Sequence, residues 1–305
     1  MRIAAAATVA AAAALLSPLP GRAQTDFDKV QIKVQKVAGS VYVLYGAGGN
    51  IAVSVGEDGV VMVDDQFAPL APKVKKAIAS ITKKPVRFIL NTHWHGDHTG
   101  GNGAFGEGGT TILAHENVRK RLAAGNPAPG PTHADPAPAQ ALPVITFDQS
   151  ATVHLNGEDI RAVHVPRGHT DGDSIVYFTK SNVVHLGDDF FAVGFPFIDL
   201  ASGGSVKGTI EALEKLIPTL PADAKLIPGH GEVTGVEALK KYARNLSDIY
   251  AQVQAGVGQR KSLEELKKER VLSKWSSMKW AFLNEDAFLE IVYADITQSQ
   301  PSTAR

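Results

Sequence analysis

Cysteine is absent from the 305 residues of this chain. Its absence excludes a disulfide scaffold, a thiol nucleophile, thiolate-bound iron–sulfur clusters and every zinc site that uses cysteine. Net charge is absent too, because 31 basic side chains balance 31 acidic ones, and the chain therefore lacks the basic footprint of a protein that binds nucleic acid. With 44% hydrophobic residues, a chain of this length can bury a full core without a structural metal.

Long hydrophobic runs are also scarce, and the longest one lies at the start of the chain. Arg2 is followed by a run of small and apolar residues over 4–16, and Gly21-Arg22-Ala23 fits a small-x-small cleavage site. This run is too short for a permanent transmembrane helix, so we predict no stable membrane anchor. The pattern is typical of a bacterial signal peptide over residues 1–23, which predicts an exported, periplasmic protein.

Beyond this segment, short apolar runs alternate with amphipathic stretches, which indicates a mixed α/β fold. Asn156-Gly157 between two of the runs is a strong signal for a β-hairpin. Helical spacing of apolar residues predicts helices over 70–81 and 206–217. The strands that we expect cover residues 41–44, 51–55, 60–63, 86–90, 152–155, 160–165, 175–178, 183–186 and 225–227.

Two regions depart from this rhythm. Six prolines within residues 125–143 exclude a helix or a central strand and predict an irregular surface excursion. After Gly235 no strand pattern follows, whereas a capping box at Ser262 and Glu265 and long apolar stripes predict helices. We therefore expect a main domain over residues 24–239 and a C-terminal helical extension over residues 240–305.

Side chains that suit a metal ion are concentrated directly after the strand expected at 86–90. His93, His95, Asp97 and His98 lie within six residues, in a loop punctuated by glycine. Neutral imidazoles and carboxylates are zinc ligands, and such a cluster at a strand end is not explained by core packing. His93 and His95 can bind one ion, while Asp97 and His98 turn towards a second.

Three later segments end a strand with one further potential ligand each. They are His169 in Gly168-His169-Thr170, Asp188 in Gly187-Asp188-Asp189, and His230 in Pro228-Gly229-His230. Together with the first cluster, and in this order, they resemble the metallo-β-lactamase superfamily, over roughly residues 41–239. The resemblance implies an αβ/βα four-layer sandwich of two mixed β-sheets, with residues 24–239 as its catalytic domain and two Zn²⁺ ions at one edge.

The resemblance also assigns the ligands. It implies that the first zinc binds His93, His95 and His169, and that the second binds Asp97, His98 and His230, with Asp188 bridging both or binding the second. A zinc-bound hydroxide would then attack a carbonyl without a side-chain base, and Asp97 would orient it as the catalytic residue. The site stays net positive, which favours a small-molecule substrate with an anionic group.

Three other residues carry narrower expectations. Asp64, which closes the strand at 60–63, is either a partner of a ligating imidazole or a turn-capping aspartate. Phe191 stands where two-zinc β-lactamases resembling this chain carry a lysine that holds the substrate carboxylate. Arg167, beside His169, is our candidate for that role instead.

We therefore interpret the chain as a β-lactamase-like zinc hydrolase with weak β-lactam hydrolysis. Asp188 replaces the cysteine of those β-lactamases, and an aspartate there is what glyoxalase II carries, so a thioesterase or a lactonase is the alternative. A non-enzymatic zinc-binding protein is disfavoured because the ligands occur singly at strand ends rather than in His-rich tracts. Five other histidines are expected to be structural or at the surface: His115, His133, His154, His164 and His185.

Overall fold

The computed structural model describes residues 25–128, 130 and 132–298. The predicted signal peptide over residues 1–23 lies outside these described residues. Within them, no helix combines the length and the hydropathy that a membrane span requires.

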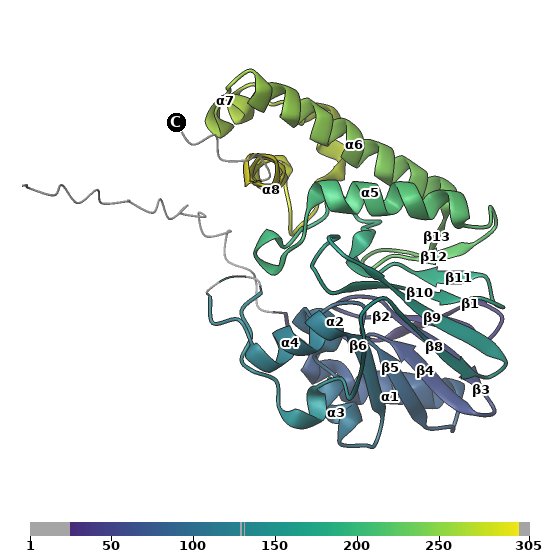
Figure 1. Cartoon of the computed structure of the whole chain (residues 1–305). Coiled ribbons are helices and arrows are strands. Elements are labelled where there is room, and N and C mark those ends of the chain that lie inside the picture. Colours follow the sequence, from purple (N-terminus) through teal and green to yellow (C-terminus); the bar gives the residue numbers. More distant parts are fainter. Residues whose placement is uncertain (1–24, 129, 131, 299–305) are drawn as a thin grey trace, which may run out of the picture.

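The described strands form two sheets that pack face to face (Figure 1). The first sheet has seven strands in the order β1 to β7, antiparallel up to β4 and parallel from β4 to β7. These strands are β1 Lys33–Ala38, β2 Val41–Tyr45, β3 Ile51–Gly56, β4 Gly59–Val63, β5 Val86–Leu90, β6 Thr111–His115 and β7 Ile145–Phe147. The second sheet has six strands in the order β13-β12-β11-β10-β9-β8, and only β11 and β12 pair in parallel. They are β8 Ser150–Leu155, β9 Glu158–Val165, β10 Asp173–Phe178, β11 Val183–His185, β12 Lys225–Ile227 and β13 Thr234–Gly235.

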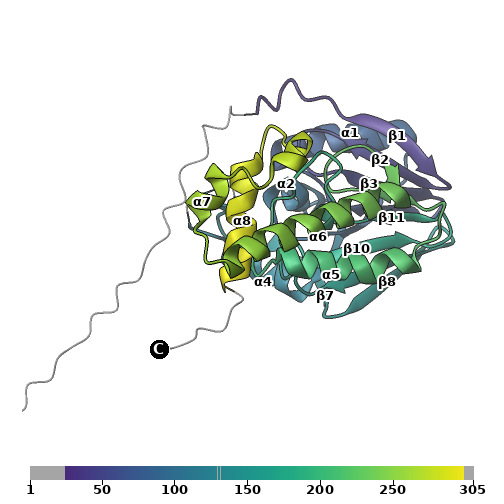
Figure 2. The same ribbon diagram turned by 90° about the horizontal axis from the view of Figure 1, so that it is seen from above.

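Helices cover the outer faces of both sheets. Helix α1 lies against the first sheet, while α5 and α6 lie over the second (Figures 1 and 2). The α-helices are α1 Ala71–Ile81, α2 Gly96–Thr99, α3 Asn102–Gly106, α4 Glu116–Ala124, α5 Val206–Leu216, α6 Val236–Gly258, α7 Leu263–Lys268 and α8 Glu285–Gln298. Short 3-10 helices are η1 Ala68–Leu70, η2 Ala139–Ala141, η3 Gly187–Asp189, η4 Leu200–Ser202, η5 Ile217–Thr219 and η6 Ser273–Met278. The predicted four-layer αβ/βα sandwich is confirmed.

Strand β4 shows why this sequence forms a sandwich. All five of its residues are buried, because the strand is covered on both faces. Val61 and Val63 point into the cluster between the two sheets, whereas Val60 and Met62 point into the cluster beneath α1. Side chains alternate between the faces of a strand, so an unbroken apolar run suits a strand with a core on each side.

Helix α6 runs continuously through the boundary that we predicted between residues 239 and 240. Leu239 and Leu246 are fully buried in one hydrophobic cluster with Val184 and Leu226 of the second sheet. Burial of each leucine contributes about 1.5–3 kcal/mol to folding. Helix α8 joins the same cluster through Phe288, so the C-terminal helices and the second sheet share one core.

Four strands were not predicted from the sequence: β1, β6, β7 and β13. Three of them lie at sheet edges, where a strand pairs on one side only and its side chains stay partly exposed. Their apolar patterns are correspondingly weak. The proline-rich region is irregular as predicted, apart from η2 and an isolated bridge between Asn126 and Ala134.

Candidate metal centre

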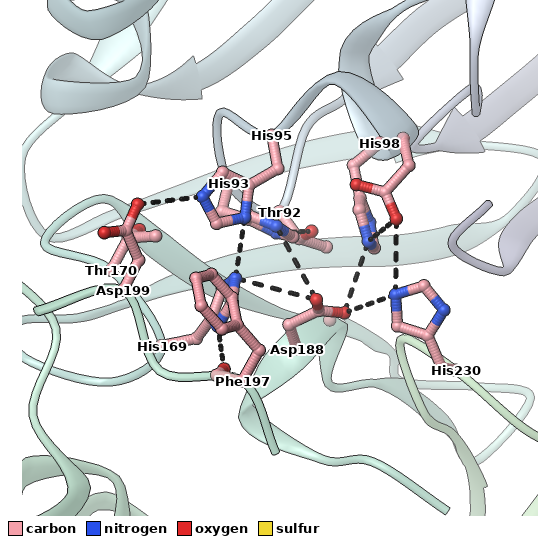
Figure 3. Close-up of polar contacts among 12 residues, drawn as sticks. Thr92, His93, His95, His98, His169, Thr170, Asp188, Phe197, Asp199 and His230 are labelled. Carbon is pink, nitrogen blue, oxygen red and sulfur yellow. Dashed lines mark hydrogen bonds and ion pairs between the residues drawn. The ribbon is translucent and has the colours of Figure 1, made fainter. Parts of the chain in front are cut away.

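Histidine and aspartate side chains from five segments meet at one edge of the sandwich (Figure 3). The loop after β5 carries His93 and His95, and α2 carries Asp97 and His98. The remaining members follow later strands: His169 lies between β9 and β10, Asp188 in η3 after β11, and His230 between β12 and β13. The structure therefore brings together all seven residues that the resemblance named as ligands.

These side chains form three overlapping groups that could hold a metal ion, each with its ligand atoms within 4.8 Å of one another. One group contains three imidazoles, and the other two contain imidazoles with a carboxylate. The groups are His93 with His95 and His169, His93 with His98 and Asp188, and Asp97 with His98 and His230.

Asp188 lies between the two ends of this centre. Its Oδ2 atom is 3.6 Å from Nε2 of His169 and 3.9 Å from Nε2 of His93. Its Oδ1 atom is 3.2 Å from Nε2 of His98 and 3.5 Å from Nε2 of His230. Each carboxylate oxygen therefore faces a different pair of imidazoles.

Hydrogen bonds fix the tautomers of His169 and His95. Nδ1 of His169 lies 2.6 Å from the carbonyl oxygen of Phe197, which only accepts, so Nδ1 must carry the proton. Nε2 of His95 lies 3.0 Å from Oδ2 of Asp199, which assigns the proton of His95 to Nε2. The lone pairs are then on Nε2 of His169 and Nδ1 of His95, which lie 2.8 Å apart and point at each other. This arrangement calls for a cation or a proton between the two nitrogens.

His98 and His93 are oriented in the same way. Nδ1 of His98 lies 2.8 Å from Oδ2 of Asp64, and Nδ1 of His93 lies 3.0 Å from Oγ1 of Thr92. The Thr92 hydroxyl donates to Asp64, so it is free to accept from His93. When neutral, both imidazoles thus have their lone pair on Nε2, which is the atom that faces the centre.

Several of these inward atoms are buried without a hydrogen-bond partner. They are Nε2 of His93, Nε2 of His98 and Oδ1 of Asp188. A buried polar atom without a partner costs about 1–3 kcal/mol. Three such atoms at one point, with imidazoles that present lone pairs, fit a bound cation.

The electrostatics of the centre separate its two sides. Burial lowers the pKa of His93 well below its usual value and lowers that of His169 to about 4, so both imidazoles stay neutral. At His98, burial also acts to lower the pKa, but the carboxylates of Asp188 and Asp97 outweigh it and raise the pKa. The pKa of His230 is shifted upward in the same way by Asp188. Without a cation, positive charge therefore accumulates where the carboxylates are.

Asp64 connects two strand ends beneath the centre. Its φ of 63° is left-handed, a backbone conformation that a residue other than glycine adopts at a cost. The carboxylate accepts from the backbone N–H and the hydroxyl of Thr92, besides contacting His98. The structure thus places Asp64 against an imidazole of the centre, and its several partners account for the strained backbone.

Phe191 and Arg167 lie in different surroundings. Phe191 is buried, and its ring stacks on that of His230 with centroids 5.2 Å apart. Arg167 is exposed, and its backbone packs against Gly208 of α5. No ion pair among the described residues joins Arg167 to the ligands. The ion pairs at the centre join only histidines and aspartates.

Sequence reasoning missed three groups that orient the ligands: Thr92, the Phe197 carbonyl and Asp199. Asp199 lies 104 residues after its partner His95, and no motif marks it. Hydrogen bonds from His95 and Ser202 outweigh the effect of its burial and lower the pKa of Asp199 to about 2, so it is a carboxylate. Thr92 precedes His93 directly, and this adjacency was the one available signal.

Solvent reaches the centre from one side. The side chains of Asp97 and His230 are 24% and 19% exposed, whereas those of the other members are at most 9% exposed. A cavity of about 500 Å³ lies next to His230. It is lined by Tyr45, Gly46, Gly48, Asn50, Ala192, Val193, Gly231, Glu232 and Thr234.

The family model described as the metallo-beta-lactamase superfamily matches residues 44–230. A metallo-beta-lactamase type 2 from Bacteroides fragilis is 27% identical over 161 residues, which are 53% of this chain and 59% of that protein. A hydroxyacylglutathione hydrolase from Hyphomonas neptunium is 32% identical over 146 residues, or 47% of each chain. The chain thus spans about half the length of the curated relatives that it matches.

Solved structures share the fold. A metallo-beta-lactamase from Pontibacter korlensis superposes with a TM-score of 0.60 and 21% identity, covering 71% of this chain and 99% of that one. A sec-alkyl sulfatase variant gives a TM-score of 0.67 with 16% identity, covering 89% of this chain and 51% of that one. At these identities the similarity establishes the architecture alone.

Proposed function

Because the chain belongs to the metallo-β-lactamase superfamily, we propose that it is a dinuclear zinc hydrolase that cleaves the acyl bond next to a carbonyl group of a small molecule. The observation that carries the proposal is the convergence of lone pairs and carboxylate oxygens on the two sides of Asp188. Histidine nitrogens and carboxylates without any thiolate suit zinc.

Each side of Asp188 has its own set of side chains. His93, His95 and His169 would hold one ion, and Asp97, His98 and His230 the other, while Asp188 would bind both ions or the second alone. When bound, the ions would act as Lewis acids and lower the pKa of coordinated water to roughly 7. Asp97, which is partly exposed at the open side, is placed to accept a hydrogen bond from the attacking water and to orient it.

The surrounding residues prepare the centre for this chemistry. Asp199, the Phe197 carbonyl, Thr92 and Asp64 hold four imidazoles in fixed orientations, so little reorganisation is needed during reaction. The net positive charge of the loaded site favours a substrate with an anionic group near the reacting carbonyl.

Among possible substrates we propose a β-lactam. We expect its hydrolysis to be weak, because Phe191 stands where a lysine would hold the substrate carboxylate. A charge-assisted hydrogen bond contributes about 1.5–3 kcal/mol, so its absence raises KM by about one to two powers of ten. Thioester or lactone hydrolysis is the alternative. The aspartate at 188 and the relatives named hydroxyacylglutathione hydrolase favour the thioester.

The test combines metal analysis with turnover. We expect about two zinc ions per chain, and hydrolysis of nitrocefin, of a lactoyl thioester or of a lactone. His98→Ala should lose metal and activity while its circular dichroism stays like that of the wild type. Two bound zincs without turnover of any of these substrates would refute the enzyme proposal, and turnover of the thioester alone would put the alternative first.

We also propose that the protein is exported to the periplasm. The support is the order of positive charge, apolar run and small residues over residues 1–23. Fractionation of expressing bacterial cells, with N-terminal sequencing of the product, tests this. A full-length product in the cytoplasm would contradict it.

A further inference from the structure

The segment between η6 and α8 is docked against the chain that follows Asp188. The backbone N–H of Phe195 donates to the carbonyl of Met278 over 2.8 Å, and Nε1–H of Trp280 donates to the carbonyl of Phe195 over 2.9 Å. Gly194 permits this approach, because its φ is 152° and a Cβ there would collide with the Met278 carbonyl oxygen. The C-terminal segment is thus fixed to a loop that ends at Asp199, the partner of His95.

This docking places a series of aromatic rings beside the imidazoles. The Trp280 ring centroid is 6.1 Å from that of Phe191 and 6.2 Å from that of His230. Phe282 continues the series, 5.6 Å from Trp280 and 5.8 Å from Phe197. Phe197 in turn contacts two more ligands, with its centroid 6.1 Å from His95 and 5.9 Å from His169. We call Phe197, Trp280 and Phe282 the aromatic arc.

The residues of the aromatic arc keep some accessible surface, and Trp280 lies beside a ligand that solvent reaches. Phe191 is buried, whereas all three arc residues are half-buried. Trp280 contacts His230, one of the two ligands that solvent reaches. Since its only polar side-chain atom already donates to Phe195, the remaining surface of the Trp280 side chain is aromatic hydrocarbon. Such surface binds flat apolar groups and offers nothing to a carboxylate.

We propose that the aromatic arc binds an aromatic ring in the acyl part of the substrate. This inference rests on the proposed hydrolase function and deepens it: the favoured substrates carry an aromatic ring in the acyl part, whether the bond cleaved belongs to a β-lactam, a thioester, an ester or a lactone. Two observations support the proposal. Ring centroids of the arc lie about 6 Å from those of three ligating histidines, and the ion pairs at the centre join only histidines and aspartates. Ring-on-ring contact adds about two- to tenfold in binding beyond simple burial.

The experiment compares two thioesters with the same leaving group, S-phenylacetyl- and S-acetyl-N-acetylcysteamine, on the zinc-loaded full chain. We expect the wild type to prefer the phenylacetyl thioester in kcat/KM, and Trp280→Ala to reduce this preference about tenfold. Trp280→Phe keeps a ring and should retain most of the preference. Tyr293→Ala, which removes a half-buried ring of α8 elsewhere in the helical extension, is the matched control and should not change it.

Calorimetry with phenylacetate and acetate gives a second readout that needs no turnover. Phenylacetate should bind more tightly than acetate, and Trp280→Ala should remove the difference; if that variant does not fold, Phe197→Ala replaces it. If the wild type and Trp280→Ala, at equal zinc content, showed the same preference for the phenylacetyl group, the proposed role of the aromatic arc would be refuted. Absence of hydrolysis of every thioester, lactone and β-lactam would refute the proposed function alone, because phenylacetate binding would still report on the arc.

Discussion

The carboxylate of Asp199 lies 3.0 Å from Nε2 of His95, although the two residues are 104 positions apart. The contact leaves Nδ1 of His95 as the nitrogen that faces the centre. Replacing Asp199 by asparagine would keep the size of the side chain and remove its charge. We expect Asp199→Asn to weaken metal binding 10–100-fold, as is usual for partners of ligating histidines.

Chelator competition followed by metal analysis would measure this change. Asp223→Asn, in an exposed turn, removes the same charge far from the centre and serves as the control. Unchanged metal affinity in Asp199→Asn would show that the contact does not orient His95.

Asp188→Cys tests whether a single sulfur atom can replace the two carboxylate oxygens of Asp188. The carboxylate directs one oxygen towards His98 and the other towards His169, whereas a thiolate offers a single sulfur. Because thiolates bind zinc well, we expect the variant to retain two zinc ions per chain. Metal analysis after dialysis measures the stoichiometry. A variant with one zinc would indicate that the carboxylate must contact both ions.

Asn50→Ala should shift the position of His230 through the residues on either side of it. The Asn50 side chain donates to the carbonyls of Pro228 and Gly231, over 2.8 and 2.7 Å, and so holds both sides of the loop that carries His230. Its backbone N–H also donates to the carbonyl of Gly229. We expect the loss of these two hydrogen bonds, one buried and one partly buried, to cost about 2–4 kcal/mol in the free energy of unfolding.

The second expected effect of Asn50→Ala is about tenfold weaker binding of one metal ion, measured by chelator titration. Asn50→Asp keeps the volume but removes both N–H donors, so it should behave at least as badly. If Asn50→Asp bound both metals like the wild type, the role of these hydrogen bonds would be refuted.

A stacked pair of histidines predicts a pH effect outside the metal centre. The rings of His115 and His164 lie 3.6 Å apart at an angle of 7°. Burial lowers the pKa of both, and the neighbouring ring adds to the shift at His115. A histidine whose pKa is lower in the folded state is protonated more readily when unfolded. The pair therefore costs stability as the pH falls below about 6.5.

The variant His164→Phe keeps a stacked ring. Between pH 7 and pH 5 we expect its free energy of unfolding to fall by about 0.5–1 kcal/mol less than that of the wild type. The magnitude is modest because His164 is only half-buried and solvent screens its charge. Urea unfolding at both pH values measures the difference. His133→Gln, outside the buried core, controls for the removal of a histidine. An equal loss of stability between pH 7 and pH 5 in His164→Phe and the wild type would contradict the prediction.

The sequence by itself determined the layers of this protein and the ligand set that we inferred for it. Runs such as Val60–Val63 are apolar at every position, and only a strand covered on both faces buries all of them. The motif from His93 to His98 places four candidate ligands in one short stretch after a strand. Such local patterns are legible because the side-chain period of a strand or helix is fixed by the backbone.

The tertiary structure decided which distant residues support those ligands. Asp199 and Asn50 lie in irregular loops, where no backbone period predicts the direction of a side chain, and each acts on a residue over a hundred positions away. The helical extension shows the same limit. Its helices follow from apolar stripes, but the contact of Trp280 with His230 depends on how the segment after η6 packs against Phe195. Packing between loops depends on the shape of the whole molecule, and the linear pattern does not contain it.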